Sequence, residues 1–312
     1  MPTFVTRVVA VVLAARPGLQ RVELDDGSRA YTLTQLSGPV AVGDRVVVNT
    51  TAVDLGLGTG GWHVVHWNLA RHAWSGGGGG REMKLRYISA QVDVAMAPPV
   101  RDDLAGAPVV VCDLHSQVGC VAHAFAAAAP GRRLVYVMTD SAALPLALSE
   151  LVPTLPLAAT VTCGQAFGGD YEAVNVTSGL LAVEADAYVV GPGPGVVGTD
   201  SRFGFGGLEN ASIVDAVDAR GGRPIVCVRW SDSDERPEHR GVSHHTVTLL
   251  EEARAIAYVA VPAGAAVETR HTLVEVEAPA PSVPVESMGR VDPGFVRWAA
   301  AAGVLAAQLV SG

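Results

Sequence analysis

The segment VVVCDLHSQVGCVAHAFAAAAPGRRLVYVMTD (Val109–Asp140) contains the most informative pattern in the chain. It begins with a continuous apolar run, Val109–Cys112, which is typical of a strand buried on both faces of a parallel sheet. The Ala-rich residues 117–129 predict a helix that ends at Pro130-Gly131. A second apolar run, Leu134–Met138, predicts the next strand. Strand, helix and strand in this order favour an α/β fold with parallel strands.

The same alternation continues toward the C-terminus. Apolar runs predict three more strands, and helical patterns alternate with them; the strands are 160–163, 187–190 and 225–229, and the helices are 144–151, 174–183, 208–220 and one within 246–258. In the tail 295–309 apolar residues recur at three- and four-residue steps, which predicts one apolar helix face. We therefore expect a mostly parallel, Rossmann-like sheet covered by helices on both faces.

Residues 4–70 show no helical period and read as short strands. Asp25-Asp26-Gly27-Ser28 lies between two strand-like runs, which is a strong hairpin signal, and VGDRVVVN (42–49) has the pattern of a strand entry in a small β-barrel. Five glycines follow Ser75, a composition typical of a flexible linker. The predicted domains are a small β-barrel-like domain (1–75), a glycine-rich connecting segment (76–106) and a Rossmann-like domain with a C-terminal helix (107–312).

Composition bounds the function classes. Hydrophobic residues make up 49% and charged residues 17% of the 312, as in globular proteins. The net charge of −9 argues against binding of nucleic acid, because an acidic chain repels phosphate backbones. No uninterrupted apolar run approaches the roughly 20 residues of a membrane span, so no membrane partner is expected. Four cysteines without a CxxC pair indicate reduced thiols and a cytoplasmic location. A homo-oligomer is left open.

A ligand site is expected at the carboxyl ends of the strands, where open parallel sheets bind their ligands. Polar residues and glycines follow every predicted strand. Those chosen as catalytic candidates are Asp113, His115, Asp140 and Asp170, and Gln165, Gly168 and Gly169 are candidates for ligand binding. The alternative is that these residues are only turn residues and helix caps.

The loop after the fourth strand is rich in glycine. Gly193, Gly195 and Gly198 would let backbone N–H groups point inward and, with Thr199, hold a phosphate or another anion. The loop lacks the lysine of a Walker motif. It is not a clean dinucleotide-binding fingerprint either, because its strand is the fourth and Pro194 removes a donor. A rigid turn is the alternative.

The segment 239–246 is dense in imidazole and hydroxyl groups. His239, His244 and His245 are candidates for proton transfer, and Arg240 and Ser243 for ligand binding. Because His244 and His245 are adjacent, they are not expected to face one ligand easily. Ser243 has a second interpretation as the N-cap of the following helix.

Two other chemistries stay open. A metal site could draw on Asp113, His115, His239 and one of His244 and His245, but no spacing demands it, so neither a metal nor a cofactor is assigned. Cys112 and Cys163 end predicted strands and are the candidate nucleophiles, against the commoner interpretation of buried, unreactive thiols.

Six phrases carry a resemblance to a known family. They are VVNTTAVDLGLGTGGWHVV (47–65), MKLRY (83–87), VYVMTDSAALPLALSELV (135–152), CGQAFGGDYEAVN (163–175), GPGVVGT (193–199) and HRGVSHHT (239–246). The chain resembles an uncharacterised bacterial family classified only as a domain of unknown function, from about residue 5 to the C-terminal helix. The resemblance implies a cytoplasmic bacterial protein and carries no activity or catalytic residues.

The sequence does not by itself decide whether the chain is an enzyme. The leading hypothesis is an enzyme of small-molecule metabolism, a hydrolase or transferase, that binds an anionic or phosphorylated ligand at the carboxyl edge of the sheet. The alternatives are a non-catalytic metabolite-binding or regulatory module, and a scaffold without a small ligand.

Overall fold

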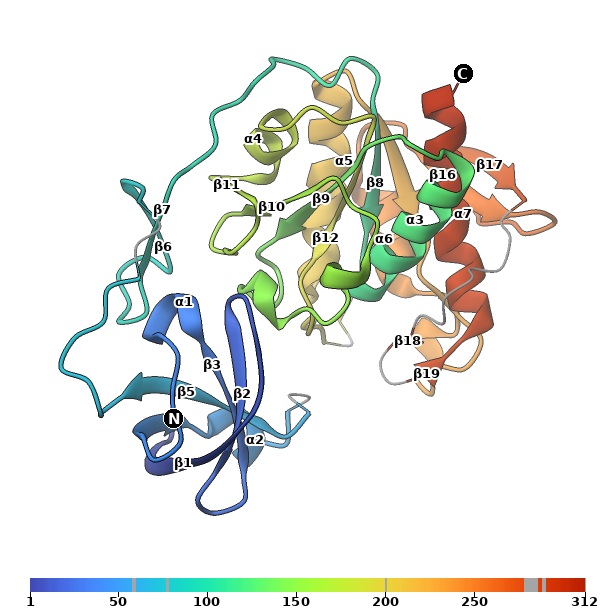
Figure 1. Cartoon of the computed structure of the whole chain (residues 1–312). Helices are drawn as coiled ribbons and strands as arrows, with labels where there is room; N and C mark the ends of the chain where they lie inside the picture. Colours follow the sequence, from blue (N-terminus) through green and yellow to red (C-terminus); the bar gives the residue numbers. More distant parts are fainter. Residues whose placement is uncertain (58–59, 77–78, 200, 278–285, 288–289, 312) are drawn as a thin grey trace. The chain divides into compact units, whose positions relative to one another are not determined.

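The computed structural model describes residues 1–57, 60–76, 79–199, 201–277, 286–287 and 290–311. The chain forms two compact units, Met1–Ala95 and Met96–Gly312 (Figure 1). The boundary between the units falls within the predicted connecting segment 76–106, of which residues 77 and 78 lie outside the described part.

The first unit contains a closed five-stranded barrel with the strand order β1-β2-β3-β5-β4. Its elements are β1 (Phe4–Arg16), β2 (Leu19–Leu24), β3 (Arg29–Leu33), α1 (Thr34–Ser37), β4 (Arg45–Asn49), α2 (Thr51–Asp54) and β5 (Trp62–Asn68). The predicted hairpin joins β2 to β3, while β3 runs parallel to β5. Five strands in this order form the barrel of an OB-fold. Val-rich alternation forms this barrel, because every second side chain points into its interior.

A small two-stranded sheet completes the first unit. It pairs β6 (Glu82–Lys84) with β7 (Val92–Val94) in antiparallel fashion. These residues belong to the predicted connecting segment, where no strands were expected.

The second unit is built on an eight-stranded sheet in which every pairing is parallel. Its order is β11-β10-β9-β12-β8-β13-β16-β17. The strands are β8 (Pro108–Cys112), β9 (Leu134–Thr139), β10 (Ala159–Cys163), β11 (Tyr171–Ala173), β12 (Ala187–Pro192), β13 (Arg223–Cys227), β16 (Tyr258–Pro262) and β17 (Thr272–Val276). The α/β class and the parallel sheet are confirmed. Two short antiparallel pairs join β14 (Trp230–Ser231) to β15 (Gly241–Val242) and β18 (Glu286–Ser287) to β19 (Arg290–Val291).

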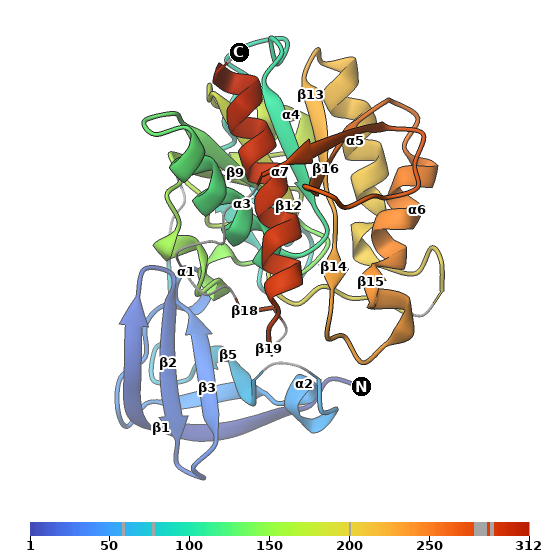
Figure 2. The same ribbon diagram turned by 90° about the vertical axis from the view of Figure 1, so that its right-hand side faces the viewer.

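Helices cover both faces of the sheet. On one face α3 (His115–Ala128) and α7 (Pro293–Ser311) pack side by side (Figure 2). The other face carries α4 (Val176–Leu181), α5 (Glu209–Ala219) and α6 (His244–Glu252). In the described part of the chain, 3-10 turns lie in the connections: η1 (Leu146–Leu148), η2 (Val152–Thr154), η3 (Gly206–Leu208) and η4 (Pro237–His239).

The secondary structure also differs from the prediction elsewhere. The helix expected at 144–151 is wrong: the backbone at Leu144 and Leu146 instead exchanges hydrogen bonds with Phe167, and Pro145 and Pro153 interrupt any longer helix. The strands β11, β16 and β17 were not predicted. Their runs are short, and β16 lies at the end of a region read as helical.

Small side chains bring α3 and α7 into close contact. A Cβ atom on Gly303 of α7 would lie 2.4 Å from the carbonyl oxygen of Val121 and 3.0 Å from the Cβ atom of Ala124. Ala299–Ala302 and Ala306 of α7 are fully buried. The Ala-rich composition of the tail therefore serves close helix packing.

One helix in the described part of the chain, α7, is long and apolar enough to cross a membrane by length and composition. It does not stand out in the sequence as an uninterrupted apolar run, because Arg297 and Gln308 interrupt it. In the structure 67% of the apolar 18-residue stretch within α7 is buried, so packing against the sheet and α3 accounts for its apolar character.

We predict that Gly303→Ala destabilises the second unit. In an unconstrained helix this change stabilises by roughly 1 kcal/mol. Here the added methyl group meets a backbone carbonyl and must push the helices apart, at a cost of about 1–3 kcal/mol. Urea unfolding measures the sign, and a variant more stable than the wild type would contradict the close contact.

Candidate functional site

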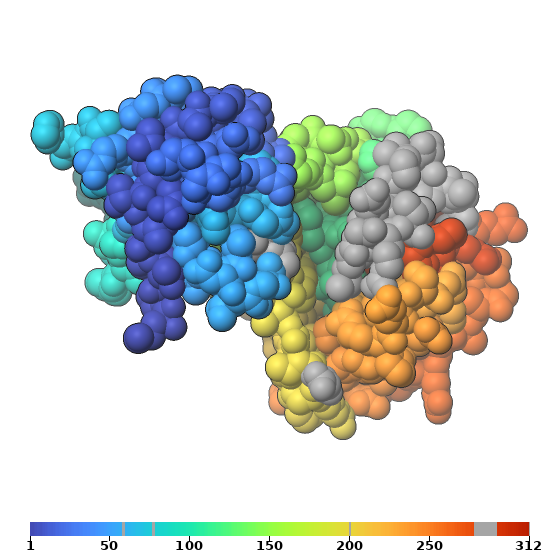
Figure 3. Space-filling view, turned by 90° about the horizontal axis from the view of Figure 1, so that it is seen from below, coloured from blue at the N-terminus to red at the C-terminus, as the bar shows by residue number. Residues whose placement is uncertain are grey.

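The carboxyl edge of the sheet has a divergence point at its central strand. The helix after β8, α3, lies on one face, whereas α5 and α6, which follow β12 and β13, lie on the other. Ligands bind at such points in open parallel sheets, because the outgoing loops separate there. Figure 3 looks onto this edge and shows residues after β12, in yellow, beside residues after β13, in orange.

Asp113 directly follows the central strand β8 and is 1% exposed. Its carboxylate accepts a hydrogen bond from Asn210 Nδ2 at 2.8 Å and another from Thr246 Oγ1 at 3.0 Å. Thr246 Oγ1 in turn accepts from the backbone N–H of Arg229 at 3.0 Å. Burial raises the pKa of Asp113, and the hydrogen bond from Asn210, the charge of Arg229 and the hydrogen bond from Thr246 oppose that rise. Asp113 thus joins the starts of α5 and α6 to the end of β8.

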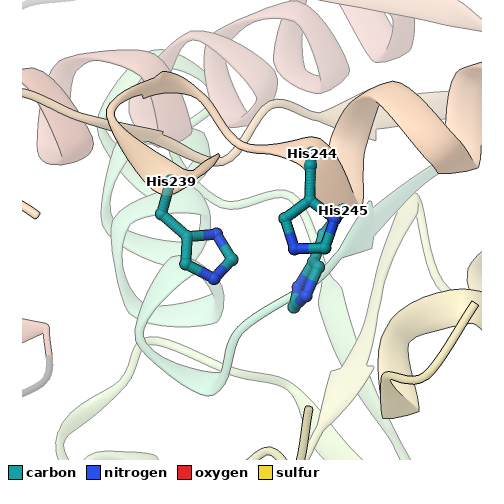
Figure 4. A group of neighbouring side chains, drawn as sticks. All are labelled: His239, His244 and His245. Carbon is teal, nitrogen blue, oxygen red and sulfur yellow. The ribbon is translucent and has the colours of Figure 1, made fainter. Parts of the chain in front are cut away.

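Three histidines converge beside this network (Figure 4). His239 comes from η4, and His244 and His245 are the first residues of α6. The ring centroids lie 4.4–4.9 Å apart, and one nitrogen of each ring lies within 4.8 Å of the others. Ser243 organises the group, because its Oγ accepts from the N–H of His245 as the N-cap of α6 and lies 2.7 Å from His239 Nδ1.

Although His244 and His245 are adjacent in the sequence, their ring centroids lie only 4.4 Å apart at the start of α6. At the first turn of a helix the two rings leave the backbone about 100° apart, and their length lets both reach the space in front of the N-terminus. His239 approaches that space from the preceding turn.

All three imidazoles are held in the neutral form near pH 7. Burial lowers the pKa of His239 to about 4 and that of His245 to about 3, and the charge of Arg229 adds to both shifts. Burial also lowers the pKa of His244, whereas Glu238 opposes this shift. The Nε2 atom of His244 is buried and has no hydrogen-bond partner among the described residues.

Arg229 fixes the protonation pattern of His245. Its Nη1 lies 2.9 Å from His245 Nδ1. An arginine is always charged and can only donate, so Nδ1 must accept and the proton of the neutral ring lies on Nε2. Phe205 stacks on the same ring at 3.8 Å with an interplanar angle of 4°. His245 is therefore held as an N–H donor rather than as a lone-pair ligand.

This tautomer bears on metal binding. By residue type and spacing, the three histidines form the ligand set of a divalent metal site. A ligating histidine normally donates its other N–H to an acceptor, however, whereas His245 accepts there from a cation. Only His239 and His244 fit the metal without rearrangement of Arg229.

The other predicted catalytic residues lie in separate networks. His115 Nδ1 is 3.1 Å from the carbonyl of Pro192, its Nε2 is 2.7 Å from Ser149 Oγ, and burial lowers its pKa to about 4. Asp140 accepts from the backbone N–H of Gln165 at 2.8 Å. Neither residue joins the three histidines.

Asp170 lies at the opposite, amino edge of the sheet. Its carboxylate accepts from the N–H and the hydroxyl of Thr160, near the start of β10. Because β11 runs parallel to β10, the loop between them must return to the amino edge, and Gly168 and Gly169 lie along this return. These residues were expected at the carboxyl edge because β11 was not predicted.

The glycine loop contributes one residue to the histidine cluster. Gly198 pairs with Phe205 in a short antiparallel bridge, and a Cβ atom on Gly198 would lie 3.6 Å from the ring of His245. Gly193 packs against the carbonyl of Ala143, and Gly195 has φ +82°. The Thr199 hydroxyl lies 3.0 Å from the carbonyl of Gly204 in the same hairpin. The loop thus places the ring of Phe205 against the ring of His245.

Arg240 donates to the backbone carbonyl of Asp234 at 3.3 Å, so it braces the loop that precedes α6. Cys112 and Cys163, the alternative nucleophiles, are buried.

Several residues of this edge were not predicted from the sequence: Arg229, Phe205, Asn210, Thr246 and Glu209. The signal that could have found Arg229 is a lone cation at the end of an apolar strand run. Burial raises the pKa of Glu209, and its Oε1 has no hydrogen-bond partner among the described residues. A shifted pKa of this kind is typical of residues at functional sites.

Comparison with known proteins gives one family. The family model described as "Protein of unknown function (DUF3866)" matches residues 29–288. No curated protein matches the chain.

We predict that Thr246→Val destabilises the protein while Thr246→Ser does not. Valine has the shape of threonine but removes the hydrogen bond to Oδ2 of Asp113 and the one from the backbone N–H of Arg229, at about 1–3 kcal/mol per buried group. Serine keeps the hydroxyl. Denaturant unfolding compares the three proteins, and equal stability of the valine variant would exclude the network as a support.

The histidines also predict how stability depends on pH. His245 binds a proton near pH 6.5 when unfolded but only near pH 3 when folded, so its contribution is complete above pH 6.5 and declines as the pH falls below it. His245→Gln should reduce the slope of unfolding free energy against pH between 6 and 5 by up to about 1.4 kcal/mol per pH unit. Equal slopes for variant and wild type would contradict the shifted pKa.

Proposed function

The chain belongs to the family described as Protein of unknown function (DUF3866), and we propose that it is an enzyme of small-molecule metabolism that binds an anionic ligand at its three histidines. The hydrogen bond from Arg229 to His245 Nδ1 is the observation that carries the proposal. It makes His245 a fixed N–H donor in a cluster built at the carboxyl edge of the sheet. Such a donor suits a phosphate or carboxylate oxygen.

The charged groups around the three histidines favour an anion whose binding is accompanied by uptake of protons. Arg236 donates a hydrogen bond to each carboxylate oxygen of Asp234. One of these oxygens, Oδ2, also lies 4.0 Å from Nη2 of Arg229. The buried Asp113 is the other carboxyl group that interacts with Arg229. Because burial and the positive charge of Arg229 lower the pKa of the histidines, the imidazoles take up protons only when a ligand brings negative charge.

Proton transfer is the role proposed for His244 and His239. A bound anion raises the pKa of nearby imidazoles toward neutrality, where acid–base catalysis is most effective. The unpartnered Nε2 of His244 is the proposed proton donor or acceptor, and Ser243 orients His239. Asp113 acts as a positioning residue through Thr246. A hydrolase or transferase reaction on a phosphorylated small molecule fits these groups.

A metal centre is the second candidate, favoured by the 4.8 Å spacing of the three imidazole nitrogens. A metal would require a lone pair at Nε2 of His245, whereas the anion site requires an N–H at that atom. A non-catalytic metabolite-binding module would use the same contacts without turnover. A cytoplasmic location and a bacterial origin are further predictions of the sequence, and a homo-oligomer stays open.

We expect inorganic phosphate and phosphate monoesters to bind more tightly at pH 6 than at pH 8, with uptake of protons. Isothermal titration calorimetry in buffers of different ionisation enthalpy measures both quantities. His245→Phe should weaken binding about 10-fold or more, because a hydrogen bond to a charged group is removed. His245→Gln is the matched control, since its amide can accept from Arg229 and donate to the anion.

The same proteins separate the alternatives. Phosphate binding that His245→Phe leaves unchanged would remove the anion site from the cluster. Cobalt(II) binding with d–d absorption bands that disappear in His244→Gln would favour the metal centre. Hydrolysis of p-nitrophenyl phosphate that is abolished in His244→Gln, with phosphate binding retained, supports the enzyme over the binding module.

A further inference from the structure

The outer face of the barrel presents a cluster of aromatic and basic side chains. Strand register places Arg21 of β2 opposite Tyr31 of β3, and Arg29 of β3 beside Trp62 of β5. Arg29 is exposed, and Arg21, Tyr31 and Trp62 are half-buried. Since side chains alternate across a strand, these four belong to one outward surface, which we call the arginine–tryptophan face.

The contacts on this face bring cations to an aromatic ring. The guanidinium carbons of Arg21 and Arg29 lie 4.9 and 4.8 Å from the centroid of the Trp62 ring. Arg29 also donates to the carbonyl of Gly60, in the loop that leads into β5. Arginine held over an aromatic ring combines a stacking surface with donors for phosphate.

The charge of the chain is divided unevenly between its units. Residues 1–95 contain nine basic and seven acidic residues, a formal charge of +2, whereas 96–312 contain 13 and 24, a charge of −11. The expectation that the chain binds no nucleic acid rests on the total of −9, which combines these two values. On the arginine–tryptophan face the acidic residue is Glu23, which lies opposite Arg29 across the strand pair.

We propose that the arginine–tryptophan face binds single-stranded nucleic acid. Trp62 and Tyr31 offer rings on which unpaired bases stack, and Arg21 and Arg29 offer charge and donors for the backbone phosphates. Bases in a duplex are already stacked on each other, so the aromatic part of the face selects single strands. The face lies on β2 and β3 and beside the loop before β5, the surface that five-stranded barrels of this topology use for extended polymers.

The test is fluorescence anisotropy of a labelled oligothymidylate of about 16 nucleotides, titrated with the full chain at several salt concentrations. Arg21→Ala with Arg29→Ala should reduce the slope of log affinity against log salt by about 0.7 for each phosphate that the protein no longer neutralises. Trp62→Ala should weaken binding roughly 10- to 100-fold with an unchanged slope, because it removes stacking. Trp62→Phe, which keeps a ring, should recover most of that affinity.

Arg45→Ala is the matched control. Arg45 is an exposed arginine on β4, at the start of a strand that pairs with the far end of β5. Affinity equal to that of the wild type supports the assigned face, whereas a decrease as large as that of the Arg21 and Arg29 variants overturns it. No binding by the wild type, or salt-independent binding of a neutral oligosaccharide instead, also overturns the proposal. None of these outcomes depends on phosphate binding at the histidines.

Discussion

The buried carboxylate of Asp113 is the constraint on which the carboxyl edge of the sheet depends. A carboxylate without water must be hydrogen-bonded, because burying it unpaired is very costly. Asn210 and Thr246 satisfy it, and each is among the first residues of a different helix. The first turns of α5 and α6 are thereby fixed to the end of β8, and the histidines that begin α6 take their positions from that attachment.

Arg229 determines the chemistry of the cluster built on this support. Its backbone N–H joins the Asp113 network through Thr246, while its side chain donates to His245. Arg229 therefore links the hydrogen-bond network of Asp113 to the tautomer of His245. The same cation lowers the pKa of all three histidines. The three imidazoles are neutral in the absence of a ligand, which is the state that burial favours.

The glycine-rich loop shows how local composition and tertiary role can differ. Its pattern suggested backbone donors for an anion, and that role remains a prediction. In the structure the bridge between Gly198 and Phe205 carries an aromatic ring onto His245. The ring covers one face of the imidazole, which is consistent with the burial that keeps His245 neutral.

Periodicity alone determined the fold class. Continuous apolar runs such as Val109–Cys112 are typical of strands covered on both faces, and the Asp-Gly turn at 26–27 joins strands by local backbone geometry. The clustering of polar residues after the strands also indicated the carboxyl edge. Strand order and the return of the loop to β11 depend on contacts between distant segments, so Asp170 was placed at the wrong edge. The convergence of His239, His244 and His245 depends on the turn and the N-cap that Ser243 forms within one short segment. The control of His245 by Arg229 depends on a contact between separate elements, which no local sequence pattern encodes.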